Sequence, residues 1–145
     1  MTTLGVFRDD YYSPYSTLPE IQYSTTSQAS GTLAASALAG ASENYVSTSG
    51  ATALTTDTAV NIIAQVYSAI QKAAAGAFPP PNIQGLTFTT YIRNTNASTL
   101  TVTAGAGVTI TGTATLATLV ERQFMVTVTS PTTVTFQDLG GSVLQ

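Results

Sequence analysis

Apolar and polar residues alternate with a period of two from residue 83 to near the C-terminal end of the chain. This period is typical of β-strands with one buried face, because successive side chains of a strand point to opposite faces. Turn residues at 94–96, 105–107 and 130–132 interrupt the alternation at short intervals. The pattern predicts a mainly β fold, with a small antiparallel β-sandwich or barrel over residues 83–145. The apolar positions expected to be buried are Leu86, Phe88, Ile92, Leu100, Val102, Val108, Ile110, Phe124, Val126, Val128, Val134 and Phe136.

A helical period replaces this alternation over residues 57–75. Apolar residues recur there at spacings of three and four, which places them in one stripe along a helix. Thr56 or Asp57 can cap the first turn, Gly76 can end the helix, and the prolines at 79–81 prevent its continuation. Two interpretations stay open: the helix packs on its own domain, or on sister helices of an oligomer. The candidate oligomer contacts in the stripe are Ile63, Val66 and Ile70.

The N-terminal part of the chain, 1–56, differs from the rest in composition. Leu, Ile, Val and Phe occupy nine positions in the range 1–56, against 25 in the range 57–145. When such residues fall below about 20 % of a segment, burial no longer offsets the entropy of the chain. Pro14 and Pro19 also disfavour helix in this part. We therefore predict a long extended N-terminal arm over residues 1–56, followed by a helix and Pro-rich connector over residues 57–82.

The tyrosines of this arm indicate a docking role. Five of the seven tyrosines of the chain precede residue 56. Tyrosine is enriched in interfaces because it offers a large apolar face and one polar tip. The alternative is a floppy N-terminus with incidental tyrosines; we favour an arm that becomes ordered by lying across another chain. The residues predicted to make this contact are Tyr11, Tyr12, Tyr15, Leu18, Ile21 and Tyr23.

Charged residues are rare in the chain. Four basic and seven acidic residues make up 8 % of it, against about a quarter in most proteins. Four scattered basic residues do not form the basic patch of a nucleic-acid-binding protein, so no nucleic-acid partner is expected. A surface with so few charges resists association only weakly, and we expect partner chains to cover much of it.

The sequence also bears on membranes and export. No stretch reaches the roughly 18 apolar residues that span a membrane, so no membrane partner is expected. Met1 is not followed by a basic segment and an apolar run. We therefore expect no signal peptide, and synthesis in the cytoplasm.

Residue types that usually carry catalysis or bind metals are missing or badly placed. The chain has no Cys and no His, which removes thiol chemistry, the commonest general base and the commonest metal ligand. Asp9 and Asp10 are neighbours in a segment expected to be extended, so their side chains point apart. Glu121 and Asp138 lie on different predicted strands, but Glu121 is next to Arg122 and an exposed ion pair is its expected role. We predict no catalytic, cofactor or metal site.

Other motifs of catalysis and phosphate binding are also absent. No Gly-x-Ser-x-Gly occurs, and Lys72, the one lysine, has no Ser at the spacing of Ser-Lys chemistry. The glycines at 105 and 107 precede a strand and not a helix, so they do not predict a phosphate-binding loop. Arg93 and Arg122 are candidate contacts between subunits, with surface solubility as the alternative role.

Three runs of the second half carry a resemblance to a known family. They are residues 99–113 (TLTVTAGAGVTITGT), 122–131 (RQFMVTVTSP) and 134–136 (VTF). Together they resemble the Thr/Gly-rich β-module of tailed-bacteriophage virion proteins, over about residues 84–139. With its long arm, the chain is similar to capsid cement (decoration) proteins, including the kind found on cyanophage heads. The same module occurs in phage fibre proteins.

This resemblance implies a virion structural protein and not an enzyme. It implies a homotrimer on the capsid exterior, seated where capsomers meet, with the arm over neighbouring major capsid protein subunits. The expected partners are the major capsid protein and other copies of the chain, without a cofactor. A clamp on several subunits would resist the pressure of packaged DNA through multivalency.

The alternative is a phage fibre or tail appendage domain that binds a receptor or glycan. Glycan sites usually present aromatic rings for stacking. After residue 82, Tyr91 is the one tyrosine, and the three phenylalanines fit the predicted core. The cement role is therefore the favoured expectation.

Overall fold

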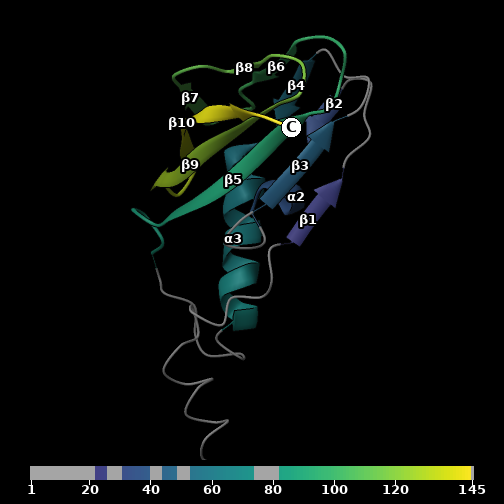
Figure 1. The fold of residues 1–145 in the computed structure, drawn as a ribbon. Helices are drawn as coiled ribbons and strands as arrows, with labels where there is room; N and C mark the ends of the chain where they lie inside the picture. Colours follow the sequence, from purple (N-terminus) through teal and green to yellow (C-terminus); the bar gives the residue numbers. More distant parts are fainter. Residues whose placement is uncertain (1–21, 26–30, 40–43, 49–52, 74–81, 145) are drawn as a thin grey trace, which may run out of the picture.

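The described residues fold into two β-sheets, one long helix and one helix of four residues (Figure 1). The computed structural model describes residues 22–25, 31–39, 44–48, 53–73 and 82–144. Its elements are β1 (Gln22–Thr25), β2 (Gly31–Leu33), α2 (Ala35–Leu38), β3 (Asn44–Thr48), β4 (Ala53–Thr56), α3 (Ala59–Ala73), β5 (Thr87–Asn94), β6 (Leu100–Thr103), β7 (Val108–Thr111), β8 (Thr115–Leu116), β9 (Val120–Ser130) and β10 (Thr133–Val143).

From β1 to β9, successive strands alternate between the two sheets. A six-stranded sheet has the order β1-β3-β5-β9-β10-β7, and a four-stranded sheet has the order β2-β4-β6-β8. Up to β6 the chain winds in three turns, β1–β2, β3–β4 and β5–β6, and each turn adds one strand to each sheet. Within each sheet, the strands of successive turns pair in parallel: β1 with β3, β3 with β5, β2 with β4 and β4 with β6. In the four-stranded sheet, Leu33 of β2, Leu54 of β4 and Leu100 of β6 are fully buried.

Antiparallel strands close one end of this winding. β9 pairs with β5 and β10, and β8 pairs with β6, all antiparallel. β7 then pairs in parallel with β10 at the edge of the six-stranded sheet. The prediction of a mainly β, sandwich-like fold with one long helix is confirmed. The sheets are mixed, however, because parallel pairing within the winding accompanies the antiparallel pairs that the alternation suggested.

The core lies between the sheets and α3. Phe124 and Phe136 are fully buried on neighbouring strands, with ring centroids 6.2 Å apart and an interplanar angle of 60°. This tilted arrangement is one that aromatic pairs prefer. Of the apolar positions predicted to be buried, Leu86, Phe88 and Ile110 are partly buried and pack against the core, and the others are buried.

Helix α3 lies within two residues of the predicted boundaries and belongs to the core of its own chain. In Figure 1 it lies behind the six-stranded sheet, and its residues contact α2 and β10. Ile63, Val66 and Ile70 are only 6–8 % exposed. These side chains are therefore not available as a surface for an oligomer, which corrects that interpretation. The reason is that the helical stripe faces the sheets, whose apolar faces need a cover.

The predicted boundary at residue 56 differs from the structure. Strands β1 to β4 and helix α2 all lie within the range predicted as an arm, and the strands belong to the two sheets. Leu33, Leu38 and Leu54 are fully buried. The strands of this range are three to five residues long, and β3 and β4 pair in parallel with β5 and β6 of the second half of the chain. Residues 1–21 lie outside the described part of the chain.

Candidate functional site

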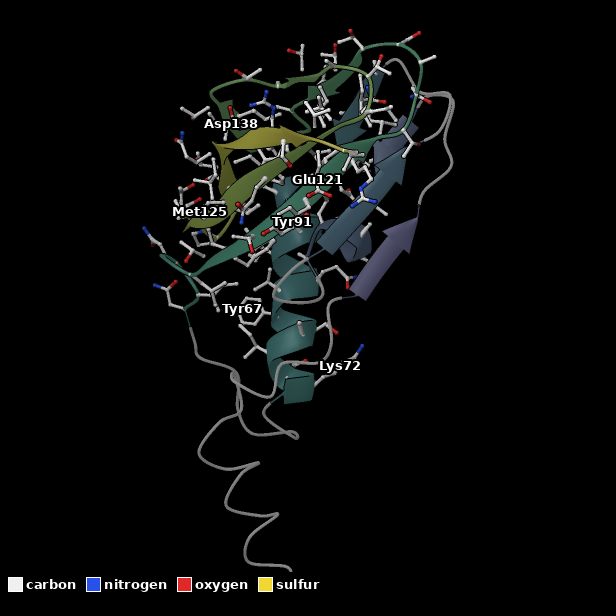
Figure 2. The ribbon with its side chains drawn as sticks, viewed as in Figure 1. Tyr67, Lys72, Tyr91, Glu121, Met125 and Asp138 are labelled. Atoms are coloured by element: carbon white, nitrogen blue, oxygen red, sulfur yellow. The ribbon has the colours of Figure 1, made fainter. Side chains whose placement is uncertain are left out.

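The candidate site lies on the outer face of the six-stranded sheet, which is turned away from α3 (Figure 1). On β5, Thr90, Ile92 and Asn94 are buried, so the alternate residues face outward. Figure 2 shows Tyr91, Glu121 and Met125 along this face. We define the outer face by its half-buried residues Thr89, Tyr91, Arg93, Glu121, Gln123, Met125, Thr127, Thr135 and Gln137.

One ion pair is the charged component of the outer face. Arg93 and Glu121 are register partners on β5 and β9. The guanidinium of Arg93 donates to Oε2 of Glu121 from Nε at 3.1 Å and from Nη2 at 3.0 Å. The side chains are 39 % and 13 % exposed, so the pair fixes the geometry of the carboxylate more than it stabilises the fold. The rest of the outer face is uncharged.

A shallow hollow of about 240 Å³ lies at one end of the outer face. Its shape follows from β10, whose register against β9 shifts between Asp138 and Gly140. Gly140 has a φ of +113°, which a residue with a side chain rarely adopts. A Cβ built at Gly140 would meet nothing within 4 Å, whereas one at Gly141 would lie 3.0 Å from the carbonyl oxygen of Glu121, so β10 passes close to β9 just after the shift. The hollow is lined by Tyr91, Glu121, Gln123, Leu139, Gly140, Gly141 and Ser142.

Arg122 and Asp138 form a second ion pair on the opposite face of the same sheet. Nη1 of Arg122 donates to both carboxylate oxygens of Asp138, at 2.9 and 2.7 Å. The side chains are 17 % and 12 % exposed. Within the described part of the chain, Nε of Arg122 is buried and has no hydrogen-bond partner. Arg122 is thus held inside its own chain, and its predicted role as a contact between subunits is not supported by its position.

Asp138 also bonds two backbone N–H groups. Its carboxylate accepts hydrogen bonds from the backbone N–H of Thr113 at 3.1 Å and from that of Gly140 at 2.9 Å. Burial by itself would raise the pKa of Asp138, but the hydrogen bonds from Arg122, Gly140 and Thr113 outweigh it and lower the pKa. The carboxylate stays ionised. Its hydrogen bonds connect Thr113, just after β7, to Gly140, where the register of β10 against β9 shifts.

The expected ion pair between Glu121 and Arg122 does not form. Adjacent residues of a strand point to opposite faces, so each of the two pairs with a residue on a neighbouring strand instead. Glu121 pairs with Arg93 on the outer face, and Arg122 pairs with Asp138 on the inner face.

Asp57 has a structural role between two helices. Its carboxylate accepts from the N–H of Ala35 at 3.0 Å, in the first turn of α2, and from the N–H of Thr58 at 2.7 Å, next to α3. Burial alone would raise its pKa, but the hydrogen bonds from Asn61, Ala35 and Thr58 lower it. The cap of α3 itself is Thr58, whose Oγ1 accepts from the N–H of Asn61 at 3.3 Å.

No protein-family model, no curated protein and no solved structure matches this chain. Within the described residues, no group of three or more acidic side chains is placed to hold a metal ion. None of the helices in this part of the chain is both long and apolar enough to span a membrane.

Of the six residues predicted to dock the N-terminal arm on a partner chain, Tyr23 lies in the described part of the structure. Tyr11, Tyr12, Tyr15, Leu18 and Ile21 lie outside the described residues. Tyr23 lies in β1, the edge strand of the six-stranded sheet, where its register partner is Tyr45 of β3. The register partner of Tyr45 is in turn Tyr91 of β5, so three tyrosine positions form a row across the sheet.

The hollow was not predicted from the sequence, although one signal pointed to it. Two adjacent glycines, Gly140 and Gly141, follow a run of alternating residues, and glycine inside a strand often marks an irregularity. The row of tyrosine positions had no such signal. Tyr23, Tyr45 and Tyr91 are separated by unequal intervals, and only the parallel pairing aligns them.

Proposed function

We propose that this chain is a virion structural protein, a capsid cement protein that clamps neighbouring major capsid protein subunits on the exterior of a phage head. The observation that carries the proposal is the outer face of the six-stranded sheet, which is nearly uncharged and has the N-terminal residues attached to its edge through β1. The proposed role is structural and needs neither catalysis nor a cofactor.

The composition of the outer face supports this role. Interface centres are depleted in charged residues, since a charge must lose its hydration on binding. Thr, Gln, Tyr and Met make up the outer face apart from Arg93 and Glu121, and these two already neutralise each other. A partner protein can therefore cover this face without burying an unpaired charge.

The position of the N-terminal residues supports a second contact. Residues 1–21 precede β1, so they start from the edge of the same sheet that carries the outer face. They contain Tyr11, Tyr12 and Tyr15, a residue type enriched in interfaces. Two linked contacts on adjacent capsid subunits raise the effective concentration of each for its site, which is the physical basis of a clamp.

Cosedimentation with expanded capsid shells assembled without this chain tests the proposal. We expect the full chain to bind, and deletion of residues 2–20 to weaken binding by about tenfold or more, because one linked contact is lost. Val60→Ala, an exposed change on α3, is the matched control that keeps binding. Unchanged binding after the deletion, or no binding by the full chain, would contradict the clamp.

We further propose that the chain forms a homotrimer where capsomers meet. Since Ile63, Val66 and Ile70 are buried within the chain, the trimer would use other surfaces. Sedimentation equilibrium is expected to give three times the 14.9 kDa mass of one chain. A monomer at all concentrations, free and on the shell, would contradict the trimer and leave the clamp standing.

The alternative is a domain of a phage fibre or tail appendage. The hollow at the end of the outer face favours it, since a concave site suits a small ligand better than a flat capsid surface. Gold-labelled antibody on purified virions separates the two roles, because label over the head supports a cement protein and label on the tail supports an appendage.

A further inference from the structure

The hollow at the end of the outer face brings together an aromatic ring, a fixed carboxylate, an amide and a hydroxyl. They belong to Tyr91, Glu121, Gln123 and Ser142, from three neighbouring strands. We propose that the hollow is a binding site for one ring of a neutral saccharide. The inference does not rest on the cement role, because it is argued from the lining of the hollow alone.

Electrostatics favour a ligand without charge. Glu121 is the one acidic residue of the lining, and Arg93 neutralises it through two hydrogen bonds of 3.0 and 3.1 Å. A cation would have to compete with Arg93, and an anion would meet the carboxylate. A neutral ligand meets neither obstacle, so charge selects against amino sugars and acidic sugars alike.

The hydrogen-bonding groups suit a ligand rich in hydroxyls. Both contacts from Arg93 go to Oε2 of Glu121, which leaves Oε1 as an oriented acceptor. Gln123 offers both donor and acceptor groups, and so does the hydroxyl of Ser142. A sugar hydroxyl both donates and accepts, so adjacent hydroxyls can satisfy such a mixed set better than a peptide group or an aromatic ligand can.

The apolar part of the lining suits the other side of a sugar ring. The C–H groups of a pyranose form an apolar surface that packs on aromatic rings, and Tyr91 supplies such a ring from β5. Leu139, which is 50 % exposed, adds an apolar wall from β10. A solvent-exposed leucine beside polar groups gains burial once a ligand covers it.

The size of the hollow sets the length of the bound unit. Its volume of about 240 Å³ lies just below the roughly 300–1,000 Å³ of sites for drug-sized ligands, so one ring is the expected occupant.

An array of immobilised oligosaccharides, probed with the full-length chain, tests the proposal. We expect binding to neutral glucose-, galactose-, mannose- or N-acetylglucosamine-containing chains and not to acidic ones. Calorimetry with the soluble form of each bound oligosaccharide then compares variants. Tyr91→Ala and Gln123→Ala are each expected to weaken binding about tenfold or more, because each removes a direct contact. Tyr91→Phe keeps the ring and is expected to stay within about threefold.

The matched control is Met125→Ala. Met125 lies two residues from Gln123 on the same face of β9 but does not line the hollow. The Met125→Ala variant should therefore bind saccharide like the parent chain. If Tyr91→Ala fails to fold, Gln123→Ala together with Tyr91→Phe still decides the matter.

Several results would overturn the inference. They are an array with no bound saccharide, binding to acidic glycans alone, capture of extended peptides in place of saccharides, or equal losses for Met125→Ala and Gln123→Ala. The capsid cosedimentation assay is run on the same variants. Ser142 lines the hollow but is not one of the residues that define the outer face, so Ser142→Ala is the variant that separates the two proposals. A Ser142→Ala chain that loses saccharide but keeps capsid binding separates this site from the clamp, so that either proposal can fail without the other.

Discussion

The two ion pairs of β9 show how position on a strand decides what a charged residue does. Glu121 and Arg122 are adjacent, yet they face opposite sides of the sheet and have different partners. On the outer face, Arg93 is 39 % exposed and its pair with Glu121 is partly solvated. On the inner face, Arg122 and Asp138 are more deeply buried, and Asp138 also bonds two backbone groups. The inner pair should therefore matter more for stability.

Asp138→Ala is expected to lower the free energy of unfolding by about 2–3 kcal/mol, because it leaves the charge of Arg122 without its partner and two N–H groups without acceptors. Glu121→Ala, the matched change on the outer face, should lower it by less than about 1 kcal/mol. Urea unfolding followed by circular dichroism measures both. Equal losses of unfolding free energy in the two variants would contradict a larger contribution of the inner pair to stability.

Two carboxylates also predict how stability depends on pH. The pKa values of Asp57 and Asp138 are lowered from the ordinary 3.8, so the folded chain binds fewer protons than the unfolded chain in acid. Their contribution is fully present above pH 3.8 and is lost as the pH falls below that value through the lower pKa of the folded state. Melting temperatures measured from neutral to acidic pH should show this decline. The double variant Asp57→Asn, Asp138→Asn should show a smaller one.

Helix α3 illustrates how one element depends on the sheets around it. Its apolar stripe is buried, whereas Val60 on the other side is 54 % exposed. Its start is fixed by Thr58 and by Asp57, which also bonds the first turn of α2. Most of the stability of such a helix comes from packing of its apolar side and not from its intrinsic propensity.

Substitutions on the two sides of α3 should differ clearly. Ile62→Ala removes a fully buried side chain and is expected to lower the free energy of unfolding by about 2–5 kcal/mol. Val60→Ala, at an exposed position of the same turn, should change it by less than about 0.5 kcal/mol. Denaturant unfolding of both variants checks this. A small effect of Ile62→Ala would mean that α3 is not part of the core.

The whole molecule is held together by pairing between segments far apart in the sequence. β4 pairs with β2 on one side and with β6 on the other, so a strand from the range predicted as an arm is bonded to the second half of the chain. Thr55 and Thr103 also share a hydrogen bond of 2.8 Å between their hydroxyls. A unit built in this way is expected to unfold as one.

Hydrogen exchange on the isolated chain tests this unity. We expect the amides of β4 that pair with its neighbours to be protected as strongly as those of β5, because both strands have a partner on each side. Peptide mass spectrometry gives the rates. Fast exchange at residues 53–56 with slow exchange at residues 87–94 would contradict the shared fold. It would support the prediction of a separate arm that ends at residue 56.

Local patterns in the sequence determined which segments of the second half are strands and where the long helix lies. Alternation placed Phe124, Val126 and Val128 on the buried face of one strand, and the structure confirms it. The spacing of Ile62, Val66 and Ile70 likewise placed the helix and its apolar stripe. Such patterns are reliable because burial of one face imposes a period on the residues themselves.

Only the tertiary structure decided how the strands pair, and this pairing in turn forms the candidate site. Parallel pairing joins residues whose separation in sequence is arbitrary, so neither the strands before residue 57 nor the row of tyrosine positions had a local signature. The partners of Glu121 and Arg122 were equally hidden, since they lie on other strands. The hollow needs the shift at Gly140 and the register of three strands together. The period of a strand is a local property, but its neighbours are set by how the whole chain closes its core.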